Sequence, residues 1–150
     1  MNSPEHWMAE ALALAEAAGA KGEVPIGAVV VRDEEVIGRG ENRTISDCDP
    51  TAHAEIVALR DAANRIGNHR LVGASLYVTI EPCSMCAGAL VHARIASLYF
   101  GAREPRAGAA GSTIDVLGNP ALNHRVAVFP GVCEQAAADM MTEFFRARRS

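Results

Sequence analysis

Two short segments that lie apart in the sequence carry metal-binding side chains, and a fold of this chain has to bring them together. One segment is His53-Ala54-Glu55 and the other is Pro82-Cys83-Ser84-Met85-Cys86. In Cys-x-x-Cys the two sulfur atoms share a face on the first turn of a helix. The exposed amide groups and the positive end of the dipole at a helix start favour thiolates, the form of cysteine that binds metal. The second segment therefore predicts a metal-binding helix start.

His53 supplies a third ligand from a second helix start. Three nitrogen and sulfur ligands leave the fourth position of a tetrahedral zinc ion for water, as in catalytic rather than structural sites. Glu55 follows His53 by two residues, so in the middle of a helix the two side chains would point apart. Both face one site only where the backbone is still entering the helix. We therefore expect zinc between two facing helix starts, where Glu55 moves protons between water and substrate.

Two other interpretations of the cysteine motif need weighing. A Cys-x-x-Cys in an α/β protein is also typical of a redox pair. A structural zinc site would need a fourth protein ligand, and the other candidates by type do not stand at ligand spacing from either motif: Cys48, Cys133, His69, His92 and His124. Cys48 and Cys133 are expected to be small buried side chains. The combination of His-x-Glu with Pro-Cys-x-x-Cys favours a catalytic site over both interpretations.

Helix signals and β-branched runs alternate along the chain. Ser3-Pro4-Glu5 marks the start of a helix that Gly19 ends. Runs over residues 26–32 and 35–40 flank Asp33-Glu34 and predict an antiparallel hairpin. Further helices are expected over 50–65, 82–93 and 134–148, and further strands over 75–80, 96–100 and 125–129. This order predicts one α/β domain over residues 1–150, with three layers and a mixed sheet.

Composition and charge narrow the function classes. The chain is 49% hydrophobic and 21% charged, which is typical of a globular protein. Acidic residues surround the apolar stretch near the N-terminus, unlike in a signal peptide, and no run reaches the roughly 20 apolar residues of a membrane span. We therefore expect a cytoplasmic protein. The net charge is −4, but residues 92–150 alone carry +2, which permits local contact with phosphates and equally suits a solvated helix end.

Most of the chain carries segments typical of one enzyme family. The pairing of His-x-Glu with Pro-Cys-x-x-Cys is the mark of zinc nucleobase deaminases. Further matching segments are VPIGAV (24–29), NR (42–43), DPTAHAE (49–55), EPCSMCAGA (81–89), FGAR (100–103), GAAGS (108–112), NHRV (123–126) and FFR (144–146). With these segments the chain resembles the bacterial tRNA-specific adenosine deaminases. The zinc core is shared across the deaminase superfamily, whereas the loop after Phe100 and the FFR segment resemble the tRNA branch.

The resemblance implies a cytidine-deaminase-like fold, a three-layer α/β/α sandwich with a mixed five-stranded sheet. It also implies a homodimer with one zinc ion per subunit, held by His53, Cys83 and Cys86, and Glu55 as the proton shuttle. The implied substrate contacts are Asn42 and the Ala54 amide at a flipped base, Ile26 and Ile80 as its apolar wall, Glu104, Arg106, Asn123 and His124 along the anticodon-loop channel, and Phe144 and Phe145 near splayed bases. The family commonly has Asp at the position of Glu104.

The implied reaction is the hydrolytic deamination of adenosine to inosine at the wobble position of a tRNA anticodon, with an arginine tRNA as the expected partner. A zinc-activated water attacks C6 of adenine, and Glu55 carries the protons. Unstacked loop bases are read by stacking and base-edge hydrogen bonds, a mode that needs little global positive charge. Two alternatives stay open: a zinc deaminase of a free base or nucleoside of guanine or cytosine type, and a non-catalytic zinc module that binds RNA.

Overall fold

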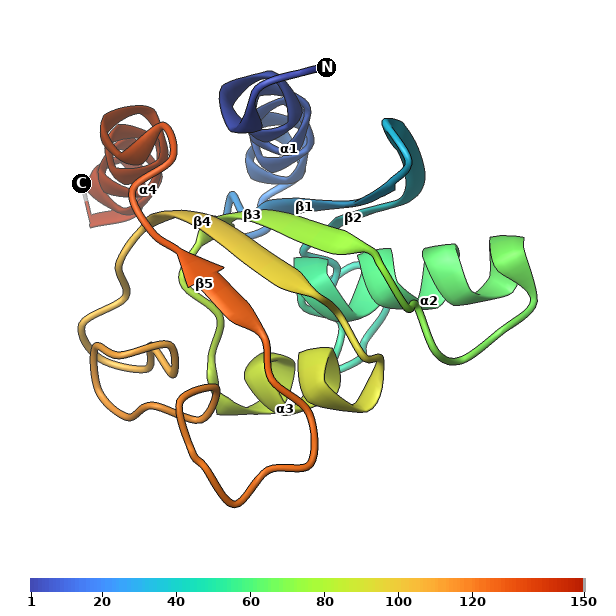
Figure 1. Cartoon of the computed structure of the whole chain (residues 1–150). Coiled ribbons are helices and arrows are strands. Elements are labelled where there is room, and N and C mark those ends of the chain that lie inside the picture. The colour runs from blue at the N-terminus through green and yellow to red at the C-terminus, as the bar shows by residue number, and fades with distance from the viewer. Residues whose placement is uncertain (150) are drawn as a thin grey trace.

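A mixed sheet lies between two layers of helices in the computed structural model, which describes residues 1–149 (Figure 1). In chain order the elements over these residues are α1 (Pro4–Ala20), β1 (Gly27–Arg32), β2 (Glu35–Glu41), α2 (Ala54–Ile66), β3 (Ser75–Ile80), α3 (Ser84–His92), β4 (Ser97–Ala102), β5 (Ala127–Phe129) and α4 (Glu134–Arg149). Helices α1 and α4 cover one face of the sheet, and α2 and α3 cover the other (Figure 1). The expected three-layer α/β fold is confirmed.

The described residues form a five-stranded sheet in the order β2-β1-β3-β4-β5. Strand β1 is antiparallel to both of its neighbours, whereas β3, β4 and β5 run parallel to one another. The carboxyl ends of β3 and β4 therefore lie at the same edge, where Ile80 pairs with Ala102. In an α/β sheet this edge is where ligands bind.

Side chains alternate between the two layers along each strand, as the pleat requires. Toward α2 and α3 the core contains Val30, Leu76, Val78, Leu98 and the fully buried Phe100. Toward α1 it contains Trp7, Met8, Val29, Val31 and Tyr77. Both faces of the central strands are thus buried, which fixes their register against the helices.

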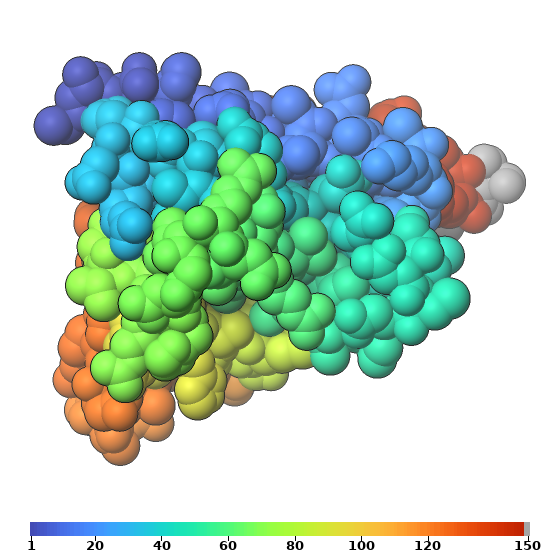
Figure 2. All heavy atoms as spheres, turned by 90° about the vertical axis from the view of Figure 1, so that its right-hand side faces the viewer, coloured from blue at the N-terminus to red at the C-terminus, as the bar shows by residue number. Residues whose placement is uncertain are grey.

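Two glycines of β2 bring α2 close to the sheet. A side chain on Gly38 would lie 2.5 Å from the carbonyl oxygen of Ala58, and one on Gly40 would meet the carbonyl of Ala54. Because neither glycine has a Cβ, α2 packs with its backbone against β2 and its first residue beside the end of that strand. Figure 2 shows α2 (green) on one face of the molecule, with the segment between β2 and α2 (blue-green) forming a lobe beside it.

Several predicted boundaries differ from the observed ones. Helix α2 begins at Ala54 rather than at residue 50, because the Asp49 carboxylate accepts the Thr51 amide at 2.9 Å and closes a local turn instead. Helix α3 begins at Ser84 rather than at Pro82, and β4 continues to Ala102. Cys48 is exposed and Cys133 half-buried, so the expectation that both are buried was wrong.

No helix within residues 1–149 combines the length and the apolar character that crossing a membrane would require.

Candidate metal centre and active site

The predicted ligands meet where two helices begin. His53 is the N-cap of α2 and Cys83 is the N-cap of α3, and both have extended backbone, with φ of −72° and −76°. His53 Nδ1 lies 3.6 Å from Cys83 Sγ and 3.5 Å from Cys86 Sγ. The ligand atoms of all three residues lie within 4.8 Å of one another. Extended N-cap geometry is what lets both motifs face a common point.

These separations fit a tetrahedral metal. Zinc binds nitrogen at about 2.0–2.1 Å and sulfur at about 2.3 Å, and a tetrahedral angle then places the two ligand atoms about 3.6 Å apart. The observed distances of 3.5 and 3.6 Å agree with that value. Over residues 1–149 the group that could hold a metal has three members, His53, Cys83 and Cys86. A closed structural site would need a fourth.

The electrostatics of the cluster favour a cation. A hydrogen bond from Cys86 and, after it, the bond with His53 lower the pKa of the Cys83 thiol to about 3. The hydrogen bond with Cys83, burial and the nearby charge of Glu55 raise the pKa of Cys86. The bond with Cys83 also raises the pKa of His53. Negative charges on the two sulfur atoms and on the Glu55 carboxylate would repel one another. A divalent cation bound by the cysteines would relieve this repulsion.

Glu55 lies beside the three ligands in the first turn of α2. Its side chain is buried, with 4% of the residue exposed. Burial raises the pKa of the carboxyl to about 7, helped by the charge on Cys83, while the positive charge of His53 and the bonds with its own amide and with Cys86 oppose the rise. A carboxyl with a pKa near the working pH can both accept and donate a proton.

The expected base-binding residues lie at the same edge of the sheet as this cluster. Asn42 is buried, and its Oδ1 accepts the Ala54 amide at 2.8 Å. The Ala54 amide, which the resemblance assigned to a substrate base, is therefore engaged by Asn42 in this structure. Ile80 is 5% exposed and packs with the half-buried Ile26 at the sheet edge. The two isoleucines are thus together, as an apolar wall requires.

The four residues expected along an RNA channel do not lie together within one chain. Glu104 and Arg106 follow β4 at the edge that carries the candidate site, and Glu104 Oε1 accepts the Arg106 amide at 2.7 Å. His124 Nε2 instead lies 2.7 Å from the carbonyl oxygen of Ile95, which precedes β4. Since β4 separates these positions at about 3.3 Å per residue, His124 lies at the opposite edge of the sheet from Glu104. Its neighbour Asn123 is exposed.

Of the two phenylalanines near the end of α4, Phe144 lines a groove and Phe145 does not. Phe144 and Phe145 meet edge to face with ring centres 5.2 Å apart, and the Arg148 guanidinium lies 3.5 Å from the centre of the Phe144 ring. Phe145 is 42% exposed. The groove has a volume of about 600 Å³ and lies between α1 and α4, with Glu16, Asp139 and Glu143 among its lining residues. One phenylalanine is thus free to stack, while the other already carries a cation.

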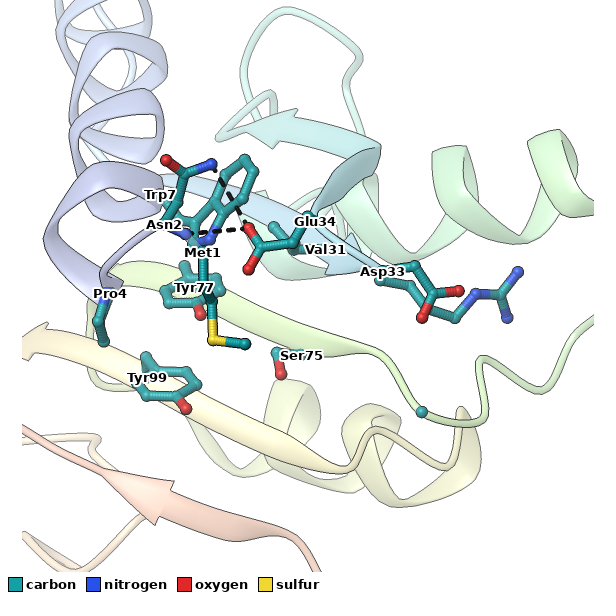
Figure 3. Close-up of a pocket in the computed structure, with 12 residues that line it drawn as sticks. Met1, Asn2, Pro4, Trp7, Val31, Asp33, Glu34, Ser75, Tyr77 and Tyr99 are labelled. Atoms are coloured by element: carbon teal, nitrogen blue, oxygen red, sulfur yellow. Dashed lines mark hydrogen bonds between the residues drawn. The ribbon is translucent and has the colours of Figure 1, made fainter.

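A second pocket lies away from the metal centre. It has a volume of about 310 Å³ and is lined by Trp7, Tyr77 and Tyr99, with Glu34 bonded to the amide of Asn2 at 3.2 Å (Figure 3). The pocket lies at the beginning of β3, whereas the candidate site lies at the end of that strand. The pocket and the cluster of potential metal ligands therefore lie at opposite edges of the sheet.

Sequence reasoning missed two buried carboxylates that hold loops near the site. Glu23 is 1% exposed and bonds to the segment after β2, and Glu81 is 3% exposed and bonds to the loop after β4. Burial alone would raise the pKa of each, but hydrogen bonds, those of Ser46 and Ser112 foremost, outweigh it and lower both pKa values. The sequence feature that could have identified Glu81 as a buried carboxylate is its position between an apolar strand and the Pro-Cys motif.

Nearly the whole chain matches known deaminases. A family model described as MafB19-like deaminase matches residues 2–149. The tRNA-specific adenosine deaminase of Haemophilus influenzae is 47% identical over 146 residues, 97% of this chain and 84% of that protein. A solved structure from a study of A-to-I editing by tRNA:A34 deaminases at the wobble position of transfer RNA is 47% identical, with a TM-score of 0.88 over 90% of this chain and 98% of that chain. The guanine deaminase from Nitrosomonas europaea has 26% identity and a TM-score of 0.83 over 96% and 85% of the two chains. The chain therefore belongs to the tRNA-specific adenosine deaminases, within the MafB19-like deaminases.

Proposed function

We propose that this protein converts adenosine to inosine at the wobble position of a tRNA anticodon, as a single deaminase domain that uses zinc. The observation that carries the proposal is the joint placement of His53, Cys83 and Cys86 at ligand distance beside the buried Glu55. Family membership supports adenosine in tRNA as the substrate. The reaction consumes water and releases ammonia.

His53, Cys83 and Cys86 are the residues that would hold zinc. Zinc bound there supplies a nucleophile at neutral pH, because it lowers the pKa of water to about 7. His53 would offer Nδ1, the ring nitrogen that lies near both sulfur atoms. A ligand set with an open fourth position fits a hydrolytic enzyme better than a scaffold, since a scaffold has no use for that position.

Glu55 moves the protons. Its carboxylate takes one proton from the attacking water and delivers it to N1 of adenine as the oxygen bonds to C6. It then takes the second proton of the same oxygen and delivers it to the amino group, so that the C6–N bond breaks and ammonia leaves. Each transfer needs a group that is protonated and deprotonated with similar ease, which a carboxyl with a pKa of about 7 provides.

Other candidate residues would contribute to substrate binding, either directly or by holding the site in place. Asn42 holds the start of α2 through the Ala54 amide and so keeps His53 and Glu55 in place. Ile26 and Ile80 would pack against the faces of the extruded base. Glu104 and Arg106 lie on the loop beside the site, where they would meet the nucleotides next to the wobble base. Phe145, exposed on α4, would stack on a splayed base.

Three finer assignments belong to the same proposal. We expect a homodimer with one zinc ion per subunit, an arginine tRNA among the substrates, and activity in the cytoplasm, where tRNA is. A dimer would let Asn123 and His124 of one subunit, which lie away from Glu104 within the chain, reach RNA bound to the other. Light scattering of the zinc-loaded protein measures the molar mass and so the number of subunits. A molar mass of one subunit would contradict the homodimer.

The test compares substrates directly. Zinc-loaded protein is incubated with the anticodon stem-loop of an arginine tRNA that has adenosine at the wobble position, and in parallel with free adenosine, guanine and cytidine. A stem-loop with guanosine at the wobble position serves as the matched control. We expect inosine from the adenosine stem-loop alone. Turnover of a free base or nucleoside alone would keep the zinc chemistry and reject the tRNA substrate.

The similarity to a guanine deaminase keeps free guanine as the second candidate, because the two proteins share a fold. The lower identity of that match makes it the weaker of the two. A protein that binds one zinc per chain but turns over none of the four substrates would instead be a zinc module that binds RNA.

A further inference from the structure

Glu81 is a buried carboxylate between the end of β3 and the turn that carries Cys83. It accepts the backbone amides of Glu104 at 3.1 Å, Ala110 at 2.9 Å and Ser112 at 3.1 Å, and also the Ser112 hydroxyl. All four donors come from the loop that follows β4. A carboxylate offers about four lone-pair positions, so these donors use its full accepting capacity.

The loop is shaped around this carboxylate. Gly108 lies so close that a Cβ there would be 2.5 Å from the Glu81 carboxyl carbon and 2.5 Å from the Glu104 carbonyl oxygen. The next residue, Ala109, is fully buried and donates its amide to the carbonyl oxygen of Pro82 at 2.8 Å. The two residues directly before Cys83 therefore hold the loop, one through its side chain and the other through its backbone.

We propose that Glu81 is a positioning residue for substrate recognition: it holds the loop of residues 103–113 in the conformation that binds RNA. The inference rests on the proposed function, in which Glu104 and Arg106 of this loop meet the nucleotides beside the wobble base. Glu81 has no accepting position left for water or substrate, which distinguishes it from Glu55. It acts through the loop and not on the reacting atoms.

The physical consequence is a coupling between two parts of the site. The Glu104 amide is bonded to Glu81, and the Glu104 carboxylate is bonded to the Arg106 amide at 2.7 Å. Without the Glu81 anchor both residues lose their fixed positions, and the loop spends part of its time open. A site that is competent for only a fraction of the time binds its ligand more weakly by that fraction.

Glu81→Gln tests the proposal. The glutamine is close in size, but one of its two polar atoms becomes a donor and faces amides that need an acceptor. We expect KM for the adenosine stem-loop to rise about tenfold or more. We expect kcat at saturating RNA and the zinc content to stay near the wild-type values. Ser112→Ala removes the hydroxyl donor alone, so it should raise KM in the same direction by a smaller factor, and it tests the proposal if Glu81→Gln does not fold.

Hydrogen exchange supplies a readout that does not depend on activity. In Glu81→Gln the amides of Glu104, Ala110 and Ser112 should exchange faster than in the wild type. Glu23→Gln is the matched control, since Glu23 is also a buried carboxylate that accepts hydrogen bonds from one segment, at Ile45 and Ser46. That variant should speed exchange at those two amides more than at the amides of residues 104–112, whereas Glu81→Gln should do the reverse.

Two results would overturn the proposal. One is unchanged KM together with unchanged exchange of the loop amides in Glu81→Gln. The other is a fall in kcat that follows lost zinc at constant KM, which would mean that Glu81 serves only to shape the metal turn. A wild type that makes no inosine from the stem-loop would reject the proposed function separately, and the exchange data would still decide whether Glu81 holds the loop.

Discussion

Glu23→Gln should destabilise the protein substantially, because the carboxylate is the acceptor around which the segment after β2 is built. It accepts the Ser46 amide at 2.6 Å, the Ser46 hydroxyl at 2.7 Å, the Ile45 amide at 3.2 Å and the Thr44 hydroxyl at 3.4 Å. The side-chain oxygen of a glutamine can still accept the hydrogen bonds that one carboxylate oxygen accepted. Its amide nitrogen is a donor, so the donors that faced the other oxygen lose their acceptor.

The magnitude follows from those contacts. One buried N–H left without an acceptor costs about 1–3 kcal/mol, and the bonds that remain lose the extra strength of a charged acceptor. We therefore expect a loss of about 2–3 kcal/mol in the free energy of unfolding at pH 7. For a chain of this length that loss corresponds to a fall in Tm of about 4–12 °C.

The effect depends on pH in a defined direction. Hydrogen bonds lower the pKa of Glu23 in the folded protein, so its stabilising contribution is present above the pKa of an unfolded glutamate, about 4.3, and is lost as the pH falls through the folded value. The difference in Tm between wild type and Glu23→Gln should be full at pH 7 and should shrink below about pH 4.

Thermal unfolding followed by circular dichroism between pH 3 and pH 8 measures both effects. The matched control is Glu10→Gln, because Glu10 is a half-buried partner of Arg39 at the surface, at 3.6 Å, and surface pairs contribute about 0–1 kcal/mol. A Glu23→Gln variant as stable as Glu10→Gln at pH 7 would refute the reasoning, and so would a difference that grows as the pH falls.

Three further changes test other parts of the account. Glu34→Gly should raise Tm slightly, by about 2–4 °C, because Glu34 adopts a φ of 61° in the hairpin turn and glycine tolerates that conformation; an unchanged or lower Tm would contradict this. Gly40→Ala should cost about 1–3 kcal/mol in chemical denaturation, because its Cβ would meet the Ala54 carbonyl; full stability would mean that α2 is not packed so closely. Cys86→Ser should lower the zinc content measured by mass spectrometry, while Cys48→Ser, at an exposed cysteine, should not; one zinc per chain in both would remove Cys86 from the ligand set.

Local signals in the sequence were sufficient to predict the layers and the meeting of His53, Cys83 and Cys86 as candidate metal ligands. The cysteines of Cys-x-x-Cys and the histidine of His-x-Glu can face a common point only if each motif lies at the start of a helix. His53 and Cys83 are indeed the N-caps of their helices. The alternation of helices and β-branched runs predicted the three-layer fold. The helix expected over 50–65 is present, but its start was wrong. Asp49 bonds to Thr51 in a turn, and the proline signal does not show that this turn forms instead.

Long-range contacts could not be predicted from local patterns. Glu81 accepts hydrogen bonds from residues 23 to 31 positions away in the sequence, and Glu23 from residues 21 to 23 positions away. A local sequence pattern cannot predict such pairings. The bond from the Ala54 amide to Asn42 likewise depends on how β2 lies beside α2. The separation of His124 from Glu104 follows from the direction of β4 in the sheet, which requires the strand order.

The central claim is that Glu55 moves protons for the deamination of a wobble adenosine beside a metal held by His53, Cys83 and Cys86. The most direct measurement is the single-turnover rate of inosine formation in the adenosine stem-loop by wild type and Glu55→Gln, at equal zinc content. We expect inosine from the wild type and a rate at least about 100-fold lower from the variant, with unchanged zinc content and Tm no lower than that of the wild type, since the buried carboxyl carries an unfavourable charge. A variant within a few-fold of the wild-type rate, or a wild type that makes no inosine, would contradict the claim.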